Sequence, residues 1–405
     1  MTRTGRTYYL LFGGYSLAQF FIAPVYPLFL VSRGLDLFQI NAVLATYLIT
    51  VFAFDVPTGA LADVAGRRRS FVLGCLVRAT AYLLYTRADG FASCLVYEFI
   101  DALGTTFVSG ALDAWAVDGV RADGHRGAVD ALFARASAIG RALMIAGGIA
   151  CGYLAEASLV FPWIAAAALF VACAVAGALR MHEPSDVPRE RRTLRGTALA
   201  GVRTVRDAPV LLPLCTLSLV AAFAAFPVHM LWQPRLEELA QTRFAILGWV
   251  VAAFNVASLV GSALLPRLLG RFRREAVLAG AAVWRAIMVA MLAGAGTLAP
   301  ALVGLVLQEA AFGVTDPVVV AWTNEHVASA QRATVLSVRT TFITLGGAAG
   351  LVVLGLVARH GGMPTAFAAS AVLLALTAPG YLLLGRAHRR APVEVEPRHA
   401  SARRS

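Results

Sequence analysis

Ionisable side chains interrupt several long apolar stretches of this 405-residue chain. The acids are Glu98, Asp101, Asp113, Glu309 and Asp316, and Arg135, Arg141 and Arg339 lie in the apolar stretches that follow them. A charge in the middle of a bilayer costs at least about 2.5–3.5 kcal/mol, so such groups are usually paired or functional. Two kinds of chemistry are open to them: static ion pairing, and the loading and release of protons.

The first set of charges has a helical spacing. At about 100° per residue, Glu98, Asp101 and Asp113 share one face of a helix. The next helix runs in the opposite direction, so depth can be compared along the two at about 1.5 Å per residue. This comparison places Arg141 near the level of Glu98 and Asp101. It places Arg135 near Asp113, and we predict that Asp113 and Arg135 form a structural ion pair.

A second set of charges repeats part of this pattern. Asp316 and Arg339 reach the same level near one membrane surface, and we predict a structural ion pair there as well. Glu309 lies near mid-membrane with no arginine at its level. A carboxylate buried without a full counter-charge takes up a proton more readily. Our candidates for proton coupling are therefore Glu98, Asp101, Glu309 and Arg141. Static salt bridges remain the alternative.

The composition places the chain in the membrane class. Hydrophobic residues make up 59% of it and charged residues only 14%, with a mean hydropathy of +0.72. A membrane-spanning helix needs about 20 apolar residues. Twelve stretches qualify: 8–31, 39–62, 71–87, 91–116, 128–155, 158–179, 209–232, 243–265, 275–296, 298–322, 333–358 and 363–385. We predict an all-α membrane protein with twelve transmembrane helices in two six-helix bundles.

The basic residues indicate how the chain is threaded. The net charge is +12, which in a soluble protein suggests nucleic acid, but here the arginines fall between apolar stretches. With a cytoplasmic N-terminus, 25 arginines lie on the cytoplasmic side and 5 outside. We therefore expect both termini in the cytoplasm. The predicted domains are a bundle at 1–179, a cytoplasmic linker at 180–208, a bundle at 209–386 and a disordered basic tail at 387–405.

A motif follows the second apolar stretch. Its residues are Gly59, Leu61, Asp63, Gly66, Arg67 and Arg68. In order and spacing they resemble the signature loop between the second and third helices of the major facilitator superfamily. The resemblance implies that family's fold of two pseudo-symmetric six-helix bundles. It also implies that helices 1, 4, 7 and 10 line a central cavity. A plain basic loop would explain the arginines but not Gly59, Asp63 and Gly66.

The resemblance also assigns a gate. In the family, an acid at the cytoplasmic end of helix 4 pairs with the first arginine of the signature loop. Carried over, Asp118 would bind Arg67 and lock the inner gate in the outward-facing state. Asp55 lies one helical turn before Gly59, and we expect it to join this cluster.

An internal repeat supports the two halves. Arg78 and Arg285 are 207 residues apart, and Trp115 and Trp322 have the same offset. The pair Gly66-Arg67 is matched here with Gly270-Arg271, displaced by 204. Parallel repeats of this kind are typical of the resembling superfamily.

Aromatic and polar residues mark the expected cavity. They are Tyr15, Gln19 and Tyr26 on the first helix, and Phe226, His229 and Trp232 on the seventh. Aromatic walls with few polar groups suit an amphipathic organic substrate. Packing or an interfacial aromatic belt is the alternative for each ring.

These observations together predict a secondary transporter. We expect proton-coupled export of an amphipathic small molecule, a drug or secondary metabolite, by alternating access. The chain resembles bacterial efflux permeases, although it lacks the helix 4 arginine and the Gly-Pro pattern in helix 5 of many proton-driven drug exporters. The alternatives are import of a small organic nutrient by the same fold, and a transporter-like sensor or lipid-moving protein.

The remaining expectations concern partners and place. No catalytic constellation or phosphate-binding Gly-rich loop occurs in the sequence, so we predict that the protein is not an enzyme. We expect no metal and no cofactor, because the proton gradient supplies the energy. The expected partners are the lipid bilayer, the substrate and protons, with no nucleic acid. We expect a monomer that crosses the plasma (inner) membrane many times.

Overall fold

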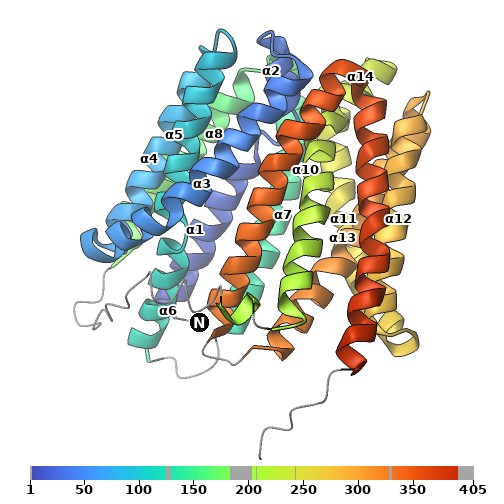
Figure 1. The fold of residues 1–405 in the computed structure, drawn as a ribbon. Coiled ribbons are helices and arrows are strands. Elements are labelled where there is room, and N and C mark those ends of the chain that lie inside the picture. Colours follow the sequence, from blue (N-terminus) through green and yellow to red (C-terminus); the bar gives the residue numbers. More distant parts are fainter. Residues whose placement is uncertain are drawn as a thin grey trace, which may run out of the picture.

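The computed structural model describes residues 2–124, 129–182, 203–206, 208–241, 243–327 and 331–390. These residues form helices and no strands (Figure 1). The first eight helices are α1 (Arg3–Phe20), α2 (Tyr26–Ser32), α3 (Leu37–Ala65), α4 (Arg67–Tyr85), α5 (Phe91–Val108), α6 (Ala111–Ala122), α7 (Asp130–Ala157) and α8 (Phe161–Arg180). The later helices are α10 (Leu211–Ala240), α11 (Phe244–Arg271), α12 (Arg274–Gly294), α13 (Leu298–Glu325) and α14 (Arg332–Arg390).

The helices cross the membrane layer twelve times. Among the described residues, nine helical spans are long and apolar enough by themselves, with α5 and α6 counted as one of them. The longest, α14, holds two crossings because its backbone reverses at Gly362, where φ is 79°. The other two crossings are α1 with the short α2, and α4. The predicted all-α architecture of twelve helices is confirmed.

Two predicted stretches are broken in the structure. The stretch 8–31 divides into α1 and α2, with turns at residues 21–25. The stretch 91–116 divides at Ser109 and Gly110, and its helix then continues to Ala122 as α6. Gly110 has a φ of 70°, in the left-handed region that glycine adopts without a steric penalty.

The crossings pack as two bundles. Within the first bundle, α4 packs against α5 and α8, and α1 packs against α7. Within the second, α10 and α12 both pack against α14, and α13 packs against α11 and α12. The bundles meet where α3 lies against α14 and α7 lies against α11 (Figure 1). The predicted linker 180–208 and tail 387–405 fall mostly outside the described residues, although α14 continues as far as Arg390.

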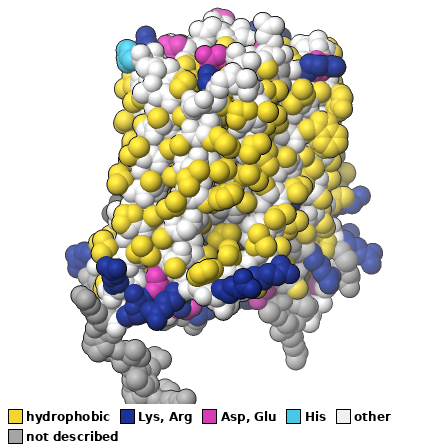
Figure 2. Space-filling view, turned by 90° about the vertical axis from the view of Figure 1, so that its right-hand side faces the viewer, with side chains coloured by type: hydrophobic (Ala, Val, Ile, Leu, Met, Phe, Trp, Pro, Cys, Tyr) yellow, Lys and Arg dark blue, Asp and Glu magenta, His cyan; other side chains and the backbone are white. Residues whose placement is uncertain are grey.

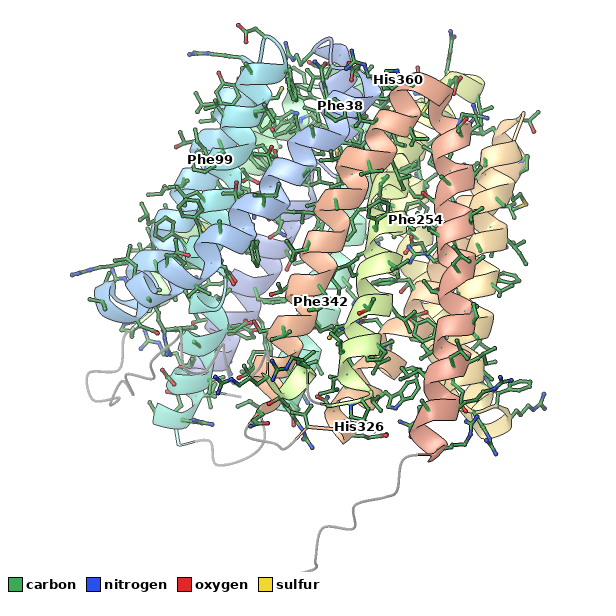
Figure 3. All side chains as sticks on the ribbon, viewed as in Figure 1. Phe38, Phe99, Phe254, His326, Phe342 and His360 are labelled. Carbon is green, nitrogen blue, oxygen red and sulfur yellow. The ribbon has the colours of Figure 1, made fainter. Side chains whose placement is uncertain are left out.

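The two ends of the molecule differ in charge. We call the end where α1 begins and α14 finishes the terminal side, and the opposite end the far side. Figure 3 labels His326 near the terminal side, and Phe38 and His360 near the far side. Figure 2 shows an apolar belt between the two ends and a dense arginine rim on the terminal side. Exposed apolar side chains such as Leu179 and Val175 of α8 would be costly in water but suit a lipid environment.

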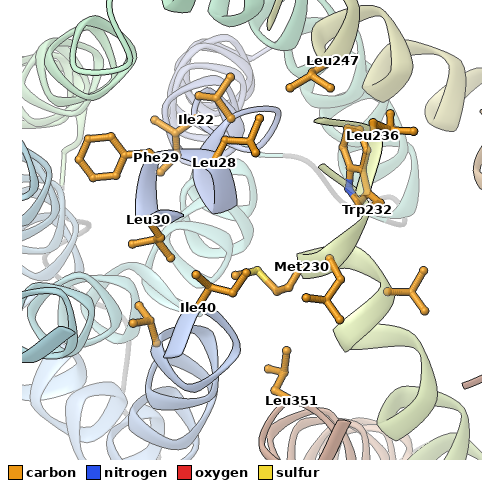
Figure 4. Close-up of a cluster of buried hydrophobic side chains, with 14 of the residues drawn as sticks. Ile22, Leu28, Phe29, Leu30, Ile40, Met230, Trp232, Leu236, Leu247 and Leu351 are labelled. Atoms are coloured by element: carbon orange, nitrogen blue, oxygen red, sulfur yellow. The ribbon is translucent and has the colours of Figure 1, made fainter. Parts of the chain in front are cut away.

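The bundles are closed together on the far side. A buried cluster there takes residues from both bundles, including Leu30, Ile40, Met230 and Leu351 (Figure 4). Polar contacts that join the bundles lie on the same side, and Asp36 with Arg359 at 3.5 Å is one of them. We therefore describe the structure as closed towards the far side.

Glycines make this closure possible. A Cβ on Gly248 of α11 would lie 2.5 Å from the Gly148 carbonyl oxygen of α7, and one on Gly152 would lie 2.8 Å from the Phe244 carbonyl oxygen. Small residues let membrane helices approach closely. The closed far side therefore depends on glycine at the crossing of α7 and α11.

We predict that Gly248→Val opens the far side. The added side chain cannot fit against the Gly148 carbonyl, and overpacking of about 1–3 kcal/mol shifts the balance towards separated bundles. Alkylation of the buried thiol of Cys151, which lies beside Gly152, should speed up about tenfold. Peptide mass spectrometry after N-ethylmaleimide treatment measures this rate. Gly270→Val on the same helix is the control, because a Cβ there meets nothing within 4 Å. Equal labelling of Cys151 in the two variants would contradict the prediction.

Candidate functional site

A buried ion pair lies at the centre of the first bundle. Arg78 of α4 donates to Asp101 of α5 through both Nε (2.7 Å to Oδ1) and Nη2 (3.0 Å to Oδ2). The two side chains are only 2% and 6% exposed. The two helices approach closely here because residue 104 is glycine. A Cβ at this position would lie only 3.0 Å from the Arg78 backbone nitrogen. This glycine contact brings the guanidinium beside the carboxylate.

The remaining donors of Arg78 are also satisfied. Its Nη1 donates to the Tyr15 hydroxyl at 2.7 Å and to Gln19 Oε1 at 3.1 Å, so α1 is tied to the pair. The guanidinium carbon lies 4.6 Å from the centre of the Phe170 ring, within cation–π range. Arg78 is therefore a fixed charge, held by hydrogen bonds and by an aromatic ring.

Glu98 lies one turn from Asp101 and is bound differently. It is 5% exposed and accepts a hydrogen bond of 2.5 Å from the Tyr85 hydroxyl. No arginine nitrogen lies within 4 Å of it in the described part of the chain. Glu98 and Asp101 both line a cavity of about 180 Å³, together with Arg78, Gln19 and Tyr26. Glu98 is thus a buried acid that faces a cavity without a cationic partner.

The predicted pairing of the α7 arginines with the acids of α5 and α6 is wrong. Arg141 and Arg135 are exposed, and neither forms an ion pair with an acid of α5 or α6 in the described structure. Asp113 instead accepts a hydrogen bond of 2.7 Å from the Tyr8 hydroxyl of α1. The physical reason is that α7 packs mainly against α1 and α11, so equal depth in the membrane does not bring its arginines to the acids.

The second bundle holds a related but different cluster. The structure brings together Asp316 and Arg339, at 2.9 Å. Glu309 accepts a hydrogen bond of 2.8 Å from Gln308 Nε2 and lies 3.9 Å from His229 Nε2. A cavity of about 240 Å³ borders this region, lined by His229, Asp316 and Arg339 among others. Its lining is richer in cations than that of the cavity in the first bundle.

The signature loop forms ion pairs on the terminal side. Arg67 binds Asp118 and lies 3.8 Å from Asp63. Gly66 joins α3 to α4 with a φ of 102°, a conformation that explains the need for glycine. Asp55 is exposed and forms no ion pair with the loop among the described residues, so its expected place in the cluster is wrong. Gly59 has open space where a Cβ would lie.

The gate pair lies within one bundle. The ion pair between Arg67 and Asp118 forms here while the bundles are closed on the far side. Both partners belong to the same bundle, so the pair fixes the α3–α4 corner to α6 and does not by itself hold the bundles together.

The second bundle contains an equivalent gate pair. Arg274 binds Glu325, and the two residues are 51 apart, as Arg67 and Asp118 are. Arg274 is the first residue of α12, as Arg67 is of α4. The constant offset of 207 therefore continues through the loop. The displaced match of Gly66-Arg67 with Gly270-Arg271 is wrong, because α11 still includes both of those residues.

The expected cavity residues divide into three groups. Gln19 and Tyr26 line the cavity of the first bundle, and Phe226 and His229 line that of the second. Tyr15 is not part of the lining of the first cavity and instead accepts a hydrogen bond from Arg78. Trp232 lines neither cavity. It is 3% exposed and packs against Phe254 in the far-side cluster, so its assignment to the substrate cavity is wrong in this structure (Figure 4).

Comparison with known proteins identifies the family. The sequence pattern of the Major Facilitator Superfamily matches residues 8–243 and 234–404. This chain belongs to the major facilitator superfamily. Among curated proteins of this superfamily, an uncharacterized MFS-type transporter, YxaM of Bacillus subtilis (strain 168), is 27% identical over 152 residues. That match spans 36% of this chain and 36% of the relative.

Solved structures of several transporters share this fold. The nucleoside transporter NupG has a TM-score of 0.80 at 13% identity, covering 95% of this chain and 100% of that one. A bacterial homolog of the human lysosomal transporter Spinster, described as inward-facing and unoccupied, has a TM-score of 0.75 at 15% identity, covering 95% and 96%. The peptide-transporter family member PepTSo has a TM-score of 0.74 at 12% identity, covering 97% and 99%. At these identities the likeness shows the fold alone.

Sequence reasoning missed Arg78 as the partner of Asp101. The signal was present, because the repeat offset already singled out Arg78 with Arg285. The same offset relates Asp101 to Gln308, so each arginine and its partner are 23 residues apart. Among the described residues of this major facilitator protein, no cluster of three or more His, Cys, Asp or Glu side chains is placed to hold a metal ion.

We predict that Asp101→Asn destabilises the protein far more than Glu98→Gln. Removing Asp101 leaves Arg78 buried without a counter-charge, and breaking such a pair costs about 3–5 kcal/mol. Gln at position 98 keeps an acceptor for Tyr85, so the cost should be about 1 kcal/mol. Melting followed by tryptophan fluorescence in detergent compares the two variants. Similar melting temperatures would show that Asp101 is not the essential counter-charge.

Proposed function

We propose that this protein is a proton-coupled antiporter that exports an amphipathic small molecule. The family makes it a transporter. The proton, the direction and the kind of substrate are our proposal, and the single observation that carries it is Glu98. This acid is buried, faces a cavity and is held by a tyrosine hydroxyl rather than by an arginine.

The environment of Glu98 suits a proton carrier. The adjacent Asp101 is already paired with Arg78, so one further negative charge at Glu98 has no cation of its own. Uptake of a proton removes that uncompensated charge, and release restores it. Glu309 is a second candidate, because its neighbours are an amide and a histidine rather than an arginine.

The shared cavity supports antiport rather than symport. Glu98 borders the same cavity as the aromatic ring of Tyr26 and the amide of Gln19. A substrate that places a hydrogen-bond-donating group against the ionised Glu98 competes with the proton for the carboxylate. Because only one of the two can occupy the site, proton entry releases the substrate, and substrate loading releases the proton.

The arginine rim supports the direction. The terminal side holds most of the arginines, which favours a cytoplasmic location for both termini in the plasma membrane (Figure 2). The cavities would then load from the cytoplasm in the present state, which is closed on the far side. An inward proton gradient would drive the return step and export the substrate.

We predict that Glu98→Gln abolishes proton-driven accumulation but spares passive exchange. In proteoliposomes with an imposed pH gradient, accumulation of a panel of amphipathic dyes should fall to the level of protein-free vesicles. Exchange of labelled for unlabelled dye needs no proton and should continue. Glu238→Gln is the matched control, because Glu238 pairs with Arg235 away from both cavities.

Two results would count against the proposal. Wild-type accumulation by Glu98→Gln would remove Glu98 from the coupling mechanism. Movement of substrate and protons in the same direction would identify an importer.

A further inference from the structure

The two bundles carry the same arginine but not the same partner. Arg78 and Arg285 occupy equivalent places, 207 residues apart, and each contacts the side chain 23 residues further on. For Arg78 that side chain is the carboxylate of Asp101. For Arg285 it is the neutral amide of Gln308, whose Oε1 accepts from Nε at 3.1 Å. The repeat has therefore kept the cation in the second bundle and replaced its counter-charge.

Nearby acids do not supply the missing charge. Asp316 is bound by Arg339 at 2.9 Å. Glu309 is bound by the amide of Gln308 at 2.8 Å and is next to His229. Within the described residues, no carboxylate oxygen lies within 4 Å of an Arg285 nitrogen. A guanidinium in a membrane protein interior is costly without an ionic partner.

The unpaired charge faces a cavity. Arg285 lines the cavity of about 240 Å³ in the second bundle, and so do the rings of Phe226, Phe312 and Tyr381. The guanidinium lies 6.0 Å from the centre of the Phe312 ring. Gln308 is itself 1% exposed and binds both Arg285 and Glu309, so it holds the guanidinium in a fixed orientation. The site offers one oriented cation beside an apolar wall.

We propose that Arg285 recognises an acidic group of the substrate, which is therefore an amphipathic organic acid. A carboxylate fits the planar fork of a guanidinium and forms charge-assisted hydrogen bonds with it. The acidic group of the ligand is then the counter-charge of Arg285, as Asp101 is the counter-charge of Arg78. The aromatic rings of the cavity contact the apolar body of the same molecule. This inference rests on the proposed function only in placing the cavity on the substrate path.

The test compares acids with their neutral amides. The probes are phenylbutyrate against phenylbutyramide, and naphthoate against naphthamide, added to the purified protein in detergent. A ligand that binds the folded state raises the melting temperature by mass action. We expect the acids to stabilise the wild type more than the amides. In Arg285→Gln the apparent affinity for the acids should fall about tenfold or more, which is the loss of a charged hydrogen bond.

Gln308→Asp and Gln308→Asn form a matched pair that differs in charge. Aspartate recreates the pairing of the first bundle, so Gln308→Asp should melt higher than Gln308→Asn without ligand and should lose the preference for acids. Gln308→Asn should keep that preference. If Arg285→Gln does not fold, these two variants still test whether the uncompensated charge of Arg285 selects acids over amides.

Clear results would overturn the inference. Equal stabilisation by acids and amides in the wild type, or acid binding that survives both Arg285→Gln and Gln308→Asp, would exclude Arg285 as the acid-binding residue. Binding in detergent needs no proton gradient, so it is independent of coupling. We expect Glu238→Gln, whose carboxylate pairs with Arg235 away from both cavities, to bind the acids as the wild type does. Failure of coupling at Glu98 and failure of acid recognition at Arg285 can therefore be told apart.

Discussion

A guanidinium buried in a membrane protein needs a counter-charge, and this requirement organises the centre of the molecule. In the first bundle Arg78 meets it with Asp101, and Tyr15 and Gln19 complete the donor set. The pair joins α1, α4 and α5 at one point, since each of these helices contributes a side chain. Close crossing of α4 and α5 at Gly104 is what allows the charges to meet. The other acid of this cavity, Glu98, has no arginine of its own, because Arg78 is already paired with Asp101.

The internal repeat explains why the two bundles share their gate ion pairs, and one replacement at the centre explains why they differ. The gate pairs Arg67–Asp118 and Arg274–Glu325 are preserved at the same offset, and they hold the same corner of each bundle. At the centre, however, Gln308 stands where the first bundle has Asp101. The first cavity is therefore lined by an extra acid and the second by an extra cation. The two cavities therefore differ in charge although their bundles are related by the repeat.

The contacts between the bundles are of another kind from those within them. On the far side, glycines at the crossing of α7 and α11 allow backbones to touch, and an apolar cluster fills the remaining space (Figure 4). The gate ion pairs lie on the terminal side and stay inside their own bundles. Each bundle can therefore move as a unit, with its gate ion pair intact, while the contacts between bundles are broken and remade.

Hydropathy and charge by themselves determined the membrane class, the twelve crossings and the division into two repeated bundles. These properties follow from local sequence, because a bilayer selects apolar length and because arginines gather on one side of it. The resemblance of the signature loop also located the partner of Arg67, since the loop and Asp118 are both close to a membrane surface. The repeat could have identified Arg78 as well, had its constant offset been followed into the centre of the helices.

Only the tertiary structure decided which charges meet. Depth along a helix gives the height of a side chain but not the neighbours of that helix, and α7 proved to pack against α1 and α11. Arg141 was expected at the level of Asp101 but is exposed. Arg78 is the arginine that pairs with Asp101. The same limit applies to Trp232, whose helix position suits a cavity but whose ring packs in the far-side cluster. The pairing of side chains depends on helix rotation and neighbours, and the sequence alone leaves both open.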